Sequence, residues 1–566
     1  MKIHNERGVA LAVALFVLVI FVVFSAIFLL RTIHEWRSTQ RDVEHIKAFY
    51  IAEGGAQAGL DGLDNLVNNF MLNTVNGMNP SSVISLAQNS LSDGLNFLVN
   101  TVKENGVVKM TLNGNQAEYN AGTTSLGAGQ YGYVVIVTEK SDPITVNSDT
   151  WDFPYNYQLQ TNGTVSSLDR DVLISGDFTV RVQRDNFAKY ALFTNRQTLP
   201  NGTNVWFTSK TDFSGPIHTN GRYNIYGNPS GVFDGLVAQY EKTARYYNNG
   251  SPVLLNANYN GVKDVPTFNA GFNRGVSAIT LTSPVQKQDL VDQATGGQSF
   301  SSNGIYVPNN GTSLTGGIFV KGNGTISLSV DGNDNPVYTI SDGTTNKKVT
   351  VNYGSNQTTV LNLNTSQTNT YTGIPDGIDN VGTIIFVDGN ITNLQGTIQK
   401  DTEITISSDD NITIENDLTY QNFTPAVGNP GDVNYVAPHA TDAKNLLGLV
   451  SWTGSVYIGN NAPDDVNVHA TVLSAAGIFQ VDDYGDQGVG PRGVATLLGG
   501  AITDSYGAFG LFNSSNGQLI SGYGRNFIYD QRMLVGNAPP YFPTLNTFIA
   551  FTNDITDKMV WQEGDI

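Results

Sequence analysis

Oxygen-bearing side chains recur at short spacing between residues 331 and 342. Asp331, Asn333 and Asn335 occupy positions 1, 3 and 5 of a calcium-loop pattern, and Asp342 falls at position 12. Calcium prefers carboxylate and amide oxygens, so this segment is the best candidate metal site in the chain. Position 6 is Pro336, where the loop requires glycine, and position 12 is Asp in place of Glu. Asp and Asn are also the commonest turn residues between strands, and that structural interpretation competes with calcium.

The sequence offers little for catalysis. Beyond residue 47 the histidines are His218, His439 and His469, which are far apart and form no H-E-x-x-H pair. There is no G-x-S-x-G motif and no phosphate-binding G-x-x-x-x-G-K-[ST] loop. The chain has no cysteine, which excludes thiolate catalysis and Cys-ligated metals. The sequence therefore predicts neither an enzyme nor a resident cofactor.

One enzymatic alternative stays open. Parallel β-helix lyases and hydrolases act on polysaccharides with carboxylates on the face of the fold, and fold alone does not decide function. A cleft with clustered Asp or Glu beside Arg or Lys would favour such an anchored carbohydrate-active enzyme. A regular ladder of Asn and Thr would favour a structural protein.

The distribution of charge excludes one class of partner. Residues 1–50 carry six basic and four acidic side chains, a net charge of +2. The remaining residues hold 24 basic and 45 acidic side chains, a net charge of −21. So acidic a body lacks the basic stripe that pairs with phosphates, and nucleic acid is not an expected partner.

The elements that must position these side chains are mostly strands. The 60 glycines among 566 residues, together with abundant Asn, Thr and Ser, are typical of short strands joined by tight turns. Beyond residue 190, short apolar segments recur at irregular spacing: 383–388, 403–407, 412–415, 447–452, 466–474, 494–498 and 527–529. This density favours a β-solenoid, with a pair of β-sandwiches as the alternative.

The N-terminal segment is a candidate membrane anchor. Residues 9–30 contain 22 consecutive residues with no charge and only Ser25 polar. At 1.5 Å per residue they span about 33 Å, enough for a bilayer core of about 30 Å. A cleaved secretory signal would have a shorter apolar run and a small-residue cleavage site, which is absent after Leu30. We expect a single span with the N-terminus in the cytoplasm and the body exported.

The helix is expected to continue past the membrane to about residue 73. Apolar residues follow at steps of three and four, at positions 46, 49, 52, 56, 60, 63, 67 and 70. Gly54-Gly55 inside this run predicts a weak point where the helix bends. Alternating segments at 130–140, 155–165 and 171–183 predict antiparallel strands that cover the stripe, with a hairpin turn at Asn162-Gly163.

The N-terminal residues resemble those of the type IV pilin-like proteins, and most closely the PilX-like minor pilins and the related minor pseudopilin. The resemblance rests on the leader ending Arg7-Gly8, the apolar run, the long helix and the string Ala-Glu-Gly-Gly-Ala at 52–56. It implies that a prepilin peptidase cuts after Gly8 and leaves Val9 as the new N-terminus. Major pilins carry Glu five residues after the cut, where this chain has Val13, and PilX-like branches often lack it too. An unprocessed anchor of the same appearance is the alternative.

Three strings in the body resemble a family of uncharacterised exported β-rich proteins that share this N-terminus. They are residues 215–221 (GPIHTNG), 404–420 (ITISSDDNITIENDLTY) and parts of 499–532 that end in Tyr-Asp-Gln-Arg. The family has no established activity, so the resemblance implies a fold and not a site.

These observations predict an α+β chain in four parts: a leader at 1–8, a transmembrane and continuing helix at 9–75, a pilin-like α/β region at 76–190, and a large β-rich body at 191–566. The expected function is assembly of a type IV pilus-type filament or surface adhesion. The expected partners are other pilin-like subunits through the helix, the membrane, and surface glycans through the body. A cell-envelope spacer outside any filament is a further alternative.

Overall fold

The chain folds into two compact units, and the first of them is discontinuous in sequence. A computed structural model of the 566 residues describes all but 1–5, 148, 209–210, 227–230, 249–250, 258–265, 282–283, 425–438, 441–443, 489, 514–516, 554, 557 and 565–566. The first unit comprises residues 1–183 and 547–566, and the second comprises residues 184–546. The second unit is therefore inserted in the first, and residues 547–566 do not belong to the body to which the sequence assigned them.

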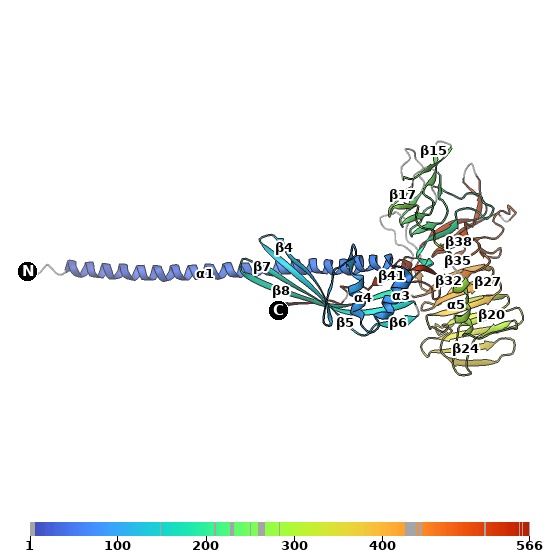
Figure 1. Cartoon of the computed structure of the whole chain (residues 1–566), viewed down its shortest axis with the longest axis horizontal. Coiled ribbons are helices and arrows are strands. Elements are labelled where there is room, and N and C mark those ends of the chain that lie inside the picture. Colours follow the sequence, from blue (N-terminus) through green and yellow to red (C-terminus); the bar gives the residue numbers. More distant parts are fainter. Residues whose placement is uncertain are drawn as a thin grey trace, which may run out of the picture. The chain divides into compact units, whose positions relative to one another are not determined.

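A single long helix opens the first unit. Helix α1 (Glu6–Asp64) passes into a π-helical turn (Asn65–Met71) and then α2 (Leu72–Gly77). Its 59 residues rise about 88 Å, and Figure 1 shows it as one uninterrupted element. Gly54 and Gly55 lie inside it, so they do not end the helix.

The second half of α1 packs on an antiparallel sheet. The central strands are β4 (Gln116–Leu126), β5 (Gly129–Glu139), β7 (Thr150–Val165) and β8 (Leu168–Asn186). Leu60, Leu63 and Val67 are buried in one cluster with the odd-numbered residues of β7, which confirms the predicted stripe. Ile46, at the start of the predicted stripe, is exposed. Strand β4 was not predicted, because its residues alternate weakly.

Glycines allow the helix and the sheet to approach closely. A Cβ atom at Gly163 would overlap the backbone N of Ala52 and the O of Ala48 in α1. On the helix side, a Cβ at Gly55 would lie 2.5 Å from Thr161 of β7, and a Cβ at Gly59 would lie 2.5 Å from Leu159.

The predicted hairpin turn at Asn162-Gly163 is wrong. Both residues pair within the β7–β8 ladder, and the turn falls at residues 166–167. Close packing, and not a tight turn, requires glycine at position 163.

The end of the chain completes the first unit. Strand β41 (Thr544–Thr552) lies next to β8 in the sheet, and β42 (Val560–Gly564) pairs antiparallel with β8. Phe548, Ala550 and Ile555 enter the core, where the Phe548 ring lies 6.0 Å from Trp151. Tyr157 donates a hydrogen bond from its hydroxyl to the Ile555 carbonyl at 3.0 Å.

The second unit is β-rich and contains two large sheets of stacked, mainly parallel strands. The first runs in the order β18, β14, β11, β9, β38, β35, β32, β28, β26, β20, with β19 antiparallel at its end. Their bounds are Phe272–Arg274, Val237–Gln239, Ile217–Thr219, Leu192–Arg196, Ala501–Ser505, Thr471–Ser474, Leu446–Ser451, Glu403–Ser408, Thr383–Asp388, Ile318–Lys321 and Gly304–Tyr306. Helix α5 (Pro284–Thr295) packs on β20 and β26.

The second large sheet has a parallel centre and antiparallel ends. Its parallel strands are β21 (Gly324–Val330), β27 (Ile391–Ile398), β29 (Ile412–Tyr420), β34 (Asn467–His469), β37 (Pro491–Leu498) and β40 (Leu519–Ile528). A meander of β22 (Pro336–Ser341), β23 (Asn346–Asn352), β24 (Gln357–Asn362) and β25 (Thr368–Thr372) extends one end, and β39 (Gly510–Phe512) the other. The apolar segments predicted beyond residue 380 all coincide with strands of these two sheets.

Equivalent residues of successive strands form ladders. The Asn323 side chain accepts a hydrogen bond from the Asn390 N–H at 2.9 Å, Asn390 accepts one from the Asn411 N–H at 3.2 Å, and Asn411 accepts one from the Ser455 N–H at 2.9 Å. In the first sheet the register places a column of six buried hydroxyl residues side by side: Ser408, Ser451, Ser474, Thr503, Thr194 and Thr219. The Asn ladder supplies acceptors for backbone N–H groups of the turns, and both ladders hold adjacent strands in register.

The chain enters the second unit in the middle of the first sheet, and its last large-sheet strand before the exit, β40, belongs to the second sheet. Strand β9 follows the entry and pairs with β11 on one side and with β38, some 300 residues later, on the other. Near the exit, the Pro543 carbonyl accepts a hydrogen bond from the Phe187 N–H at 3.1 Å. The stack therefore has two arms, residues 192–274 and residues 304–505, which meet at the β9–β38 pair.

Candidate functional site

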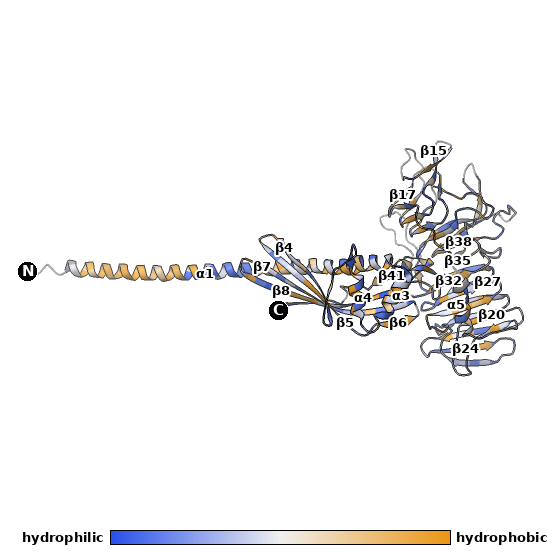
Figure 2. Ribbon diagram, viewed as in Figure 1, coloured by the Kyte–Doolittle hydropathy of each residue, from blue (hydrophilic) through white to orange (hydrophobic). Residues whose placement is uncertain are grey.

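The N-terminal third of α1 exposes a continuous apolar surface. Within the described residues, one helix is long and apolar enough to cross a membrane, and it is this one. Figure 2 shows the hydrophobic residues running along this part of α1. Side chains from Val9 to Leu30 are exposed all round the helix, with Phe28 at 74%. A helix that is apolar on every face and has no protein cover fits a lipid environment.

The predicted processing site lies at the start of this helix. Gly8 and Val9 are both in α1 and exposed, and a Cβ atom at Gly8 would meet nothing within 4 Å. Residues 1–5 of the predicted leader lie outside the described residues. The bond between Gly8 and Val9 is therefore free of contacts with the described part of the chain.

The predicted calcium ligands are separated in the structure. Asp331, Asn333 and Asn335 share the turn between β21 and β22, whereas Asp342 lies in the turn between β22 and β23. Strand β22 places its six residues, about 20 Å of extended chain, between the two turns. Calcium ligands lie 2.3–2.6 Å from the ion, so Asp342 cannot join the other three around one ion.

Each of these carboxylates binds the backbone of its own turn. One Asp331 oxygen accepts hydrogen bonds from the N–H groups of Asn333 at 2.8 Å and Asn335 at 2.9 Å, and the other accepts from the Asn335 side chain at 3.1 Å. The bonds from Asn335 lower the pKa of the Asp331 carboxyl. Burial raises the pKa of Asp342, but bonds from Thr345 and Thr344 outweigh burial and lower it. These are Asx turns, the structural alternative that the sequence left open.

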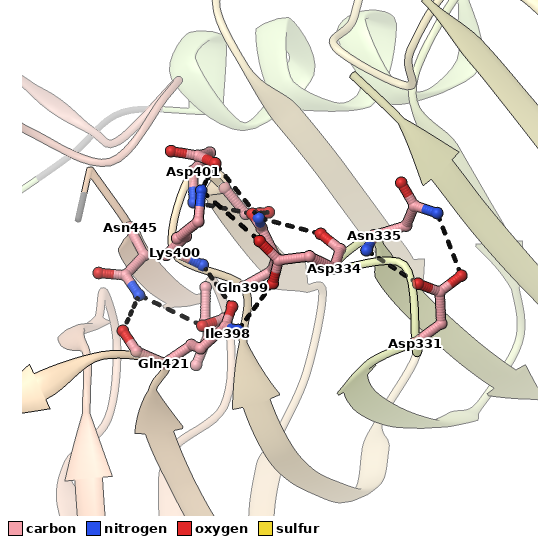
Figure 3. A network of polar contacts seen from close by, with 10 residues as sticks. Asp331, Asp334, Asn335, Ile398, Gln399, Lys400, Asp401, Gln421 and Asn445 are labelled. Atoms are coloured by element: carbon pink, nitrogen blue, oxygen red, sulfur yellow. Dashed lines mark hydrogen bonds and ion pairs between the residues drawn. The ribbon is translucent and has the colours of Figure 1, made fainter. Parts of the chain in front are cut away.

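The turn at Asp331 is tied to the neighbouring strands by a polar network (Figure 3). The Gln421 side chain donates a hydrogen bond to the Asp334 carboxylate at 2.8 Å, and the Gln399 amide donates to the Asp334 carbonyl at 3.1 Å. Lys400 forms ion pairs with Asp401 and, at 3.6 Å, with Asp334. Across the described part of the chain, no three His, Asp or Glu side chains gather as a metal-binding group.

Of the three histidines beyond residue 47, His218 and His469 have described side chains, and both are buried. His218 stacks on Phe193 with ring centroids 5.2 Å apart, and its Nε2 lies 3.0 Å from the Asn220 side-chain oxygen. His469 Nδ1 accepts a hydrogen bond from the Tyr420 N–H at 3.0 Å. Burial lowers the pKa of both rings, that of His469 to about 4. Both contacts are structural, and the side chain of His439 lies outside the described residues.

The strings that carry the family resemblance in the body meet one another. A Cβ atom at Gly215 would lie 2.5 Å from the Tyr529 ring, and the Tyr529 hydroxyl donates to the Lys189 carbonyl at 2.9 Å. Arg532 pairs with Asp530 at 2.6 Å and lies over the Tyr420 ring at 5.3 Å. Lys189 lies shortly after the entry of the body, and Tyr529 and Arg532 lie shortly before its exit. These contacts pack the three strings on one another.

Sequence reasoning missed one set of residues that could bind a ligand. Arg196, Arg222 and Arg245 line a pocket on the N-terminal arm of the body. They lie 23 to 26 residues apart in the sequence. Arg196 ends β9, Arg222 lies between β11 and β12 (Asn224–Ile225), and Arg245 lies in β15 (Ala244–Asn248), so the parallel β9–β11 and β12–β15 pairs bring them together. The sequence carries no local signal for this pairing.

Comparison with known proteins gives one match. No curated protein and no solved structure matches the chain. Residues 151–239 match the family model of a domain of unknown function, DUF4900. The matched segment begins in β7, crosses from the first unit into the second at residues 183–184 and ends with β14. This chain is thus similar to DUF4900 over the strands that join its helix-bearing unit to its β-rich body.

Proposed function

We propose that this protein is a membrane-anchored, exported, pilin-like structural protein that acts in type IV pilus-type filament assembly or surface adhesion. The observation that carries the proposal is α1: 22 exposed apolar residues continue without a break into a helix that a sheet covers. The apolar part is long enough to cross a bilayer, and the covered part fixes a folded domain to it. The body then lies on the exported side, and the N-terminus lies in the cytoplasm.

The body supports a structural role. We infer that its two large sheets are two faces of one β-solenoid, because strands of the first sheet alternate along the chain with strands of the second. Asn and hydroxyl ladders run across the strands, which is the pattern expected of a structural stack. Such a body displays a large and acidic surface.

The resemblance of residues 5–70 to PilX-like proteins supports the assembly part of the proposal. In that reading the helix inserts beside the helices of other pilin-like subunits after cleavage at Gly8. The exposed apolar surface of α1 is available for such contacts in the membrane and in a filament.

The test is the mature N-terminus, measured by mass spectrometry of the native protein. We expect a chain that begins at Val9, and Gly8→Leu should leave an uncut chain that keeps residues 1–8. Both forms should remain in the membrane fraction because residues 9–30 are intact, so the assay separates processing from anchoring. A native chain that retains Met1 would contradict the pilin-like part and leave an unprocessed anchor.

A second measurement addresses the enzymatic alternative. The purified body should release no reducing or unsaturated sugars from acidic polysaccharides. Sustained release that a single Asp substitution abolishes would contradict the structural proposal.

A further inference from the structure

A polar pocket of about 280 Å³ lies on the N-terminal arm of the body. Its wall comes from the end of β9 and the residues after it, from the turn that follows β11, and from β12 (Asn224–Ile225) and β15 (Ala244–Asn248). These last two strands belong to a small sheet that β10 (Trp206–Phe207) and β16 (Ser251–Leu255) complete. Three of the eight arginines between residues 184 and 546 line it, and its other side chains are mostly Asn, Gln and Thr. A concentration of guanidinium groups is unexpected on so acidic a body.

One of the three guanidinium groups is available to a ligand. Arg196 pairs with Asp504. Arg222 pairs with Glu241 at 2.9 Å and also donates to the Thr243 carbonyl at 2.9 Å. In the described part of the chain, no acidic side chain pairs with Arg245, which is partly exposed. The wall therefore carries a net charge of about +1, which suits one carboxylate.

Two buried amide atoms in the wall have no hydrogen-bond partner among the residues that the structure describes. Gln197 is 3% exposed and accepts a hydrogen bond from the Thr194 hydroxyl, but its Nε2 donor is unsatisfied among the described residues. Asn224 is 2% exposed and donates to the Val205 carbonyl at 3.1 Å, but its Oδ1 acceptor is likewise unsatisfied there. Buried polar groups are almost always hydrogen-bonded, so one unused donor and one unused acceptor at a pocket indicate a polar ligand.

Aromatic side chains continue the same face of the small sheet. Trp206, Asn224 and Arg245 are paired in register, so they share a face. Tyr247 lies two residues further along β15 and therefore on that face as well, and Tyr226, one residue past the end of β12, packs against the Tyr247 ring. Their ring centroids are 4.6 Å apart, and Tyr226 is 46% exposed. Exposed aromatic rings beside polar groups offer an apolar surface to a partly polar ligand.

We propose that this pocket binds one carboxylated sugar residue of an acidic glycan. The carboxylate pairs with Arg245, and the hydroxyl groups meet the Gln197 and Asn224 amides, which turn from their buried positions toward the pocket. The aromatic face of Trp206, Tyr226 and Tyr247 receives the apolar side of a sugar ring next along the glycan. The volume, just below the range typical of small-ligand pockets, holds one ring and not a longer segment. The site goes beyond the anchor function and does not depend on processing at Gly8.

Isothermal titration of the full chain in detergent micelles tests the site. The probes are trigalacturonate and its methyl ester, which keeps the hydroxyl groups and loses the charges. We expect saturable binding of the acid and at least tenfold weaker binding of the ester, because the ester cannot form the charge-assisted pair. Arg245→Gln should weaken binding of the acid at least tenfold and leave binding of the ester unchanged.

Matched variants separate the pocket from the general charge of the arm. Lys242→Gln removes the same charge from an exposed side chain three residues away and should bind both probes as the native chain does. Trp206→Ala should weaken both probes equally. Absence of saturable binding at millimolar trigalacturonate, equal affinity for acid and ester, or native affinity in Arg245→Gln would each overturn the proposal. The mature N-terminus is measured separately, so failure here is distinguishable from failure of the anchor function.

Discussion

At the scale of single residues, the Asp331 carboxylate stabilises its own turn. Its oxygens already accept two backbone N–H groups and one side-chain amide. We expect Asp331→Ala to lower the free energy of unfolding of the body by about 1 kcal/mol, because it leaves turn N–H groups without an acceptor. The loss should be the same in calcium and in a chelator when unfolding is followed by circular dichroism.

Asn333→Ala is the control in the same turn, since no side-chain hydrogen bond of Asn333 is seen in the described structure. A melting temperature that rises with calcium in the native chain and not in Asp331→Ala would show that the turn binds the ion after all.

Buried His469 should make stability depend on pH. The unfolded ring takes up a proton near pH 6.5, whereas burial lowers the folded pKa to about 4. Between these values the unfolded state binds more protons, so the free energy of unfolding falls as pH drops from 6.5 to about 4. The loss from this ring amounts to about 3 kcal/mol, and His218 acts in the same direction.

His469→Asn keeps an acceptor for the Tyr420 N–H and removes the titration. Denaturant unfolding at several pH values should show a shallower slope for this variant than for the native chain. His34→Asn, at an exposed position of α1, should leave the slope unchanged. Equal slopes for native and His469→Asn proteins would contradict the assignment.

At the scale of elements, the contact between α1 and β7 depends on the absence of side chains. Gly163→Ala should destabilise the first unit by about 1–3 kcal/mol, because the added methyl would overlap the helix backbone at Ala48 and Ala52. Thermal unfolding of residues 31–566 measures the change.

Gly77→Ala is the matched substitution in open space at the end of α2, where a Cβ meets nothing within 4 Å. It should stabilise the helix by a few tenths to about 1 kcal/mol. If both variants melt like the native chain, the helix does not pack on β7 as closely as described.

The elements themselves were largely predictable, but their pairing was not. The apolar span, the stripe at 60, 63 and 67, and the strands beyond residue 380 follow from local periodicity, which the chain retains in the fold. The predicted turn at Asn162-Gly163 was wrong because packing of Gly163 against α1 overrides the local turn preference. The four candidate calcium ligands lie in two different turns because β22 extends the chain between them, and spacing in sequence carries no such information.

At the scale of the whole molecule, two cores share one chain. Deleting residues 547–566 removes Phe548, Ala550 and Ile555 from the first core and leaves the second core untouched. We expect hydrogen exchange to become fast in β5, β7 and β8 and to stay slow in β26 and β28.

Deleting only residues 558–566 provides the control, because it removes β42, whose Val560 and Trp561 are exposed, and keeps the buried residues of β41. This shorter deletion should leave most of the protection against hydrogen exchange in β5 and β7 intact. Residues 547–566 return to a sheet whose other strands lie nearly 400 residues earlier, and such a return leaves no local signal in the sequence. This explains why the sequence assigned them to the body.

Residues 31–566 should form a soluble protein. This fragment carries 28 basic and 48 acidic side chains, a net charge of −20, and lacks the apolar span. Sedimentation at physiological salt should show a monomer. Aggregation would indicate that the body needs the helix or a partner to cover an apolar surface.

The entry and exit of the body have a mechanical consequence. A load that pulls the second unit away from the first passes through two covalent connections, at residues 183–184 and 546–547, and not through one. The first lies in β8 and the second in β41, which are neighbours in the sheet of the first unit. Tension at the first connection reaches β9, which lies inside the first sheet of the body between β11 and β38, so both of its ladders must break before this strand can leave.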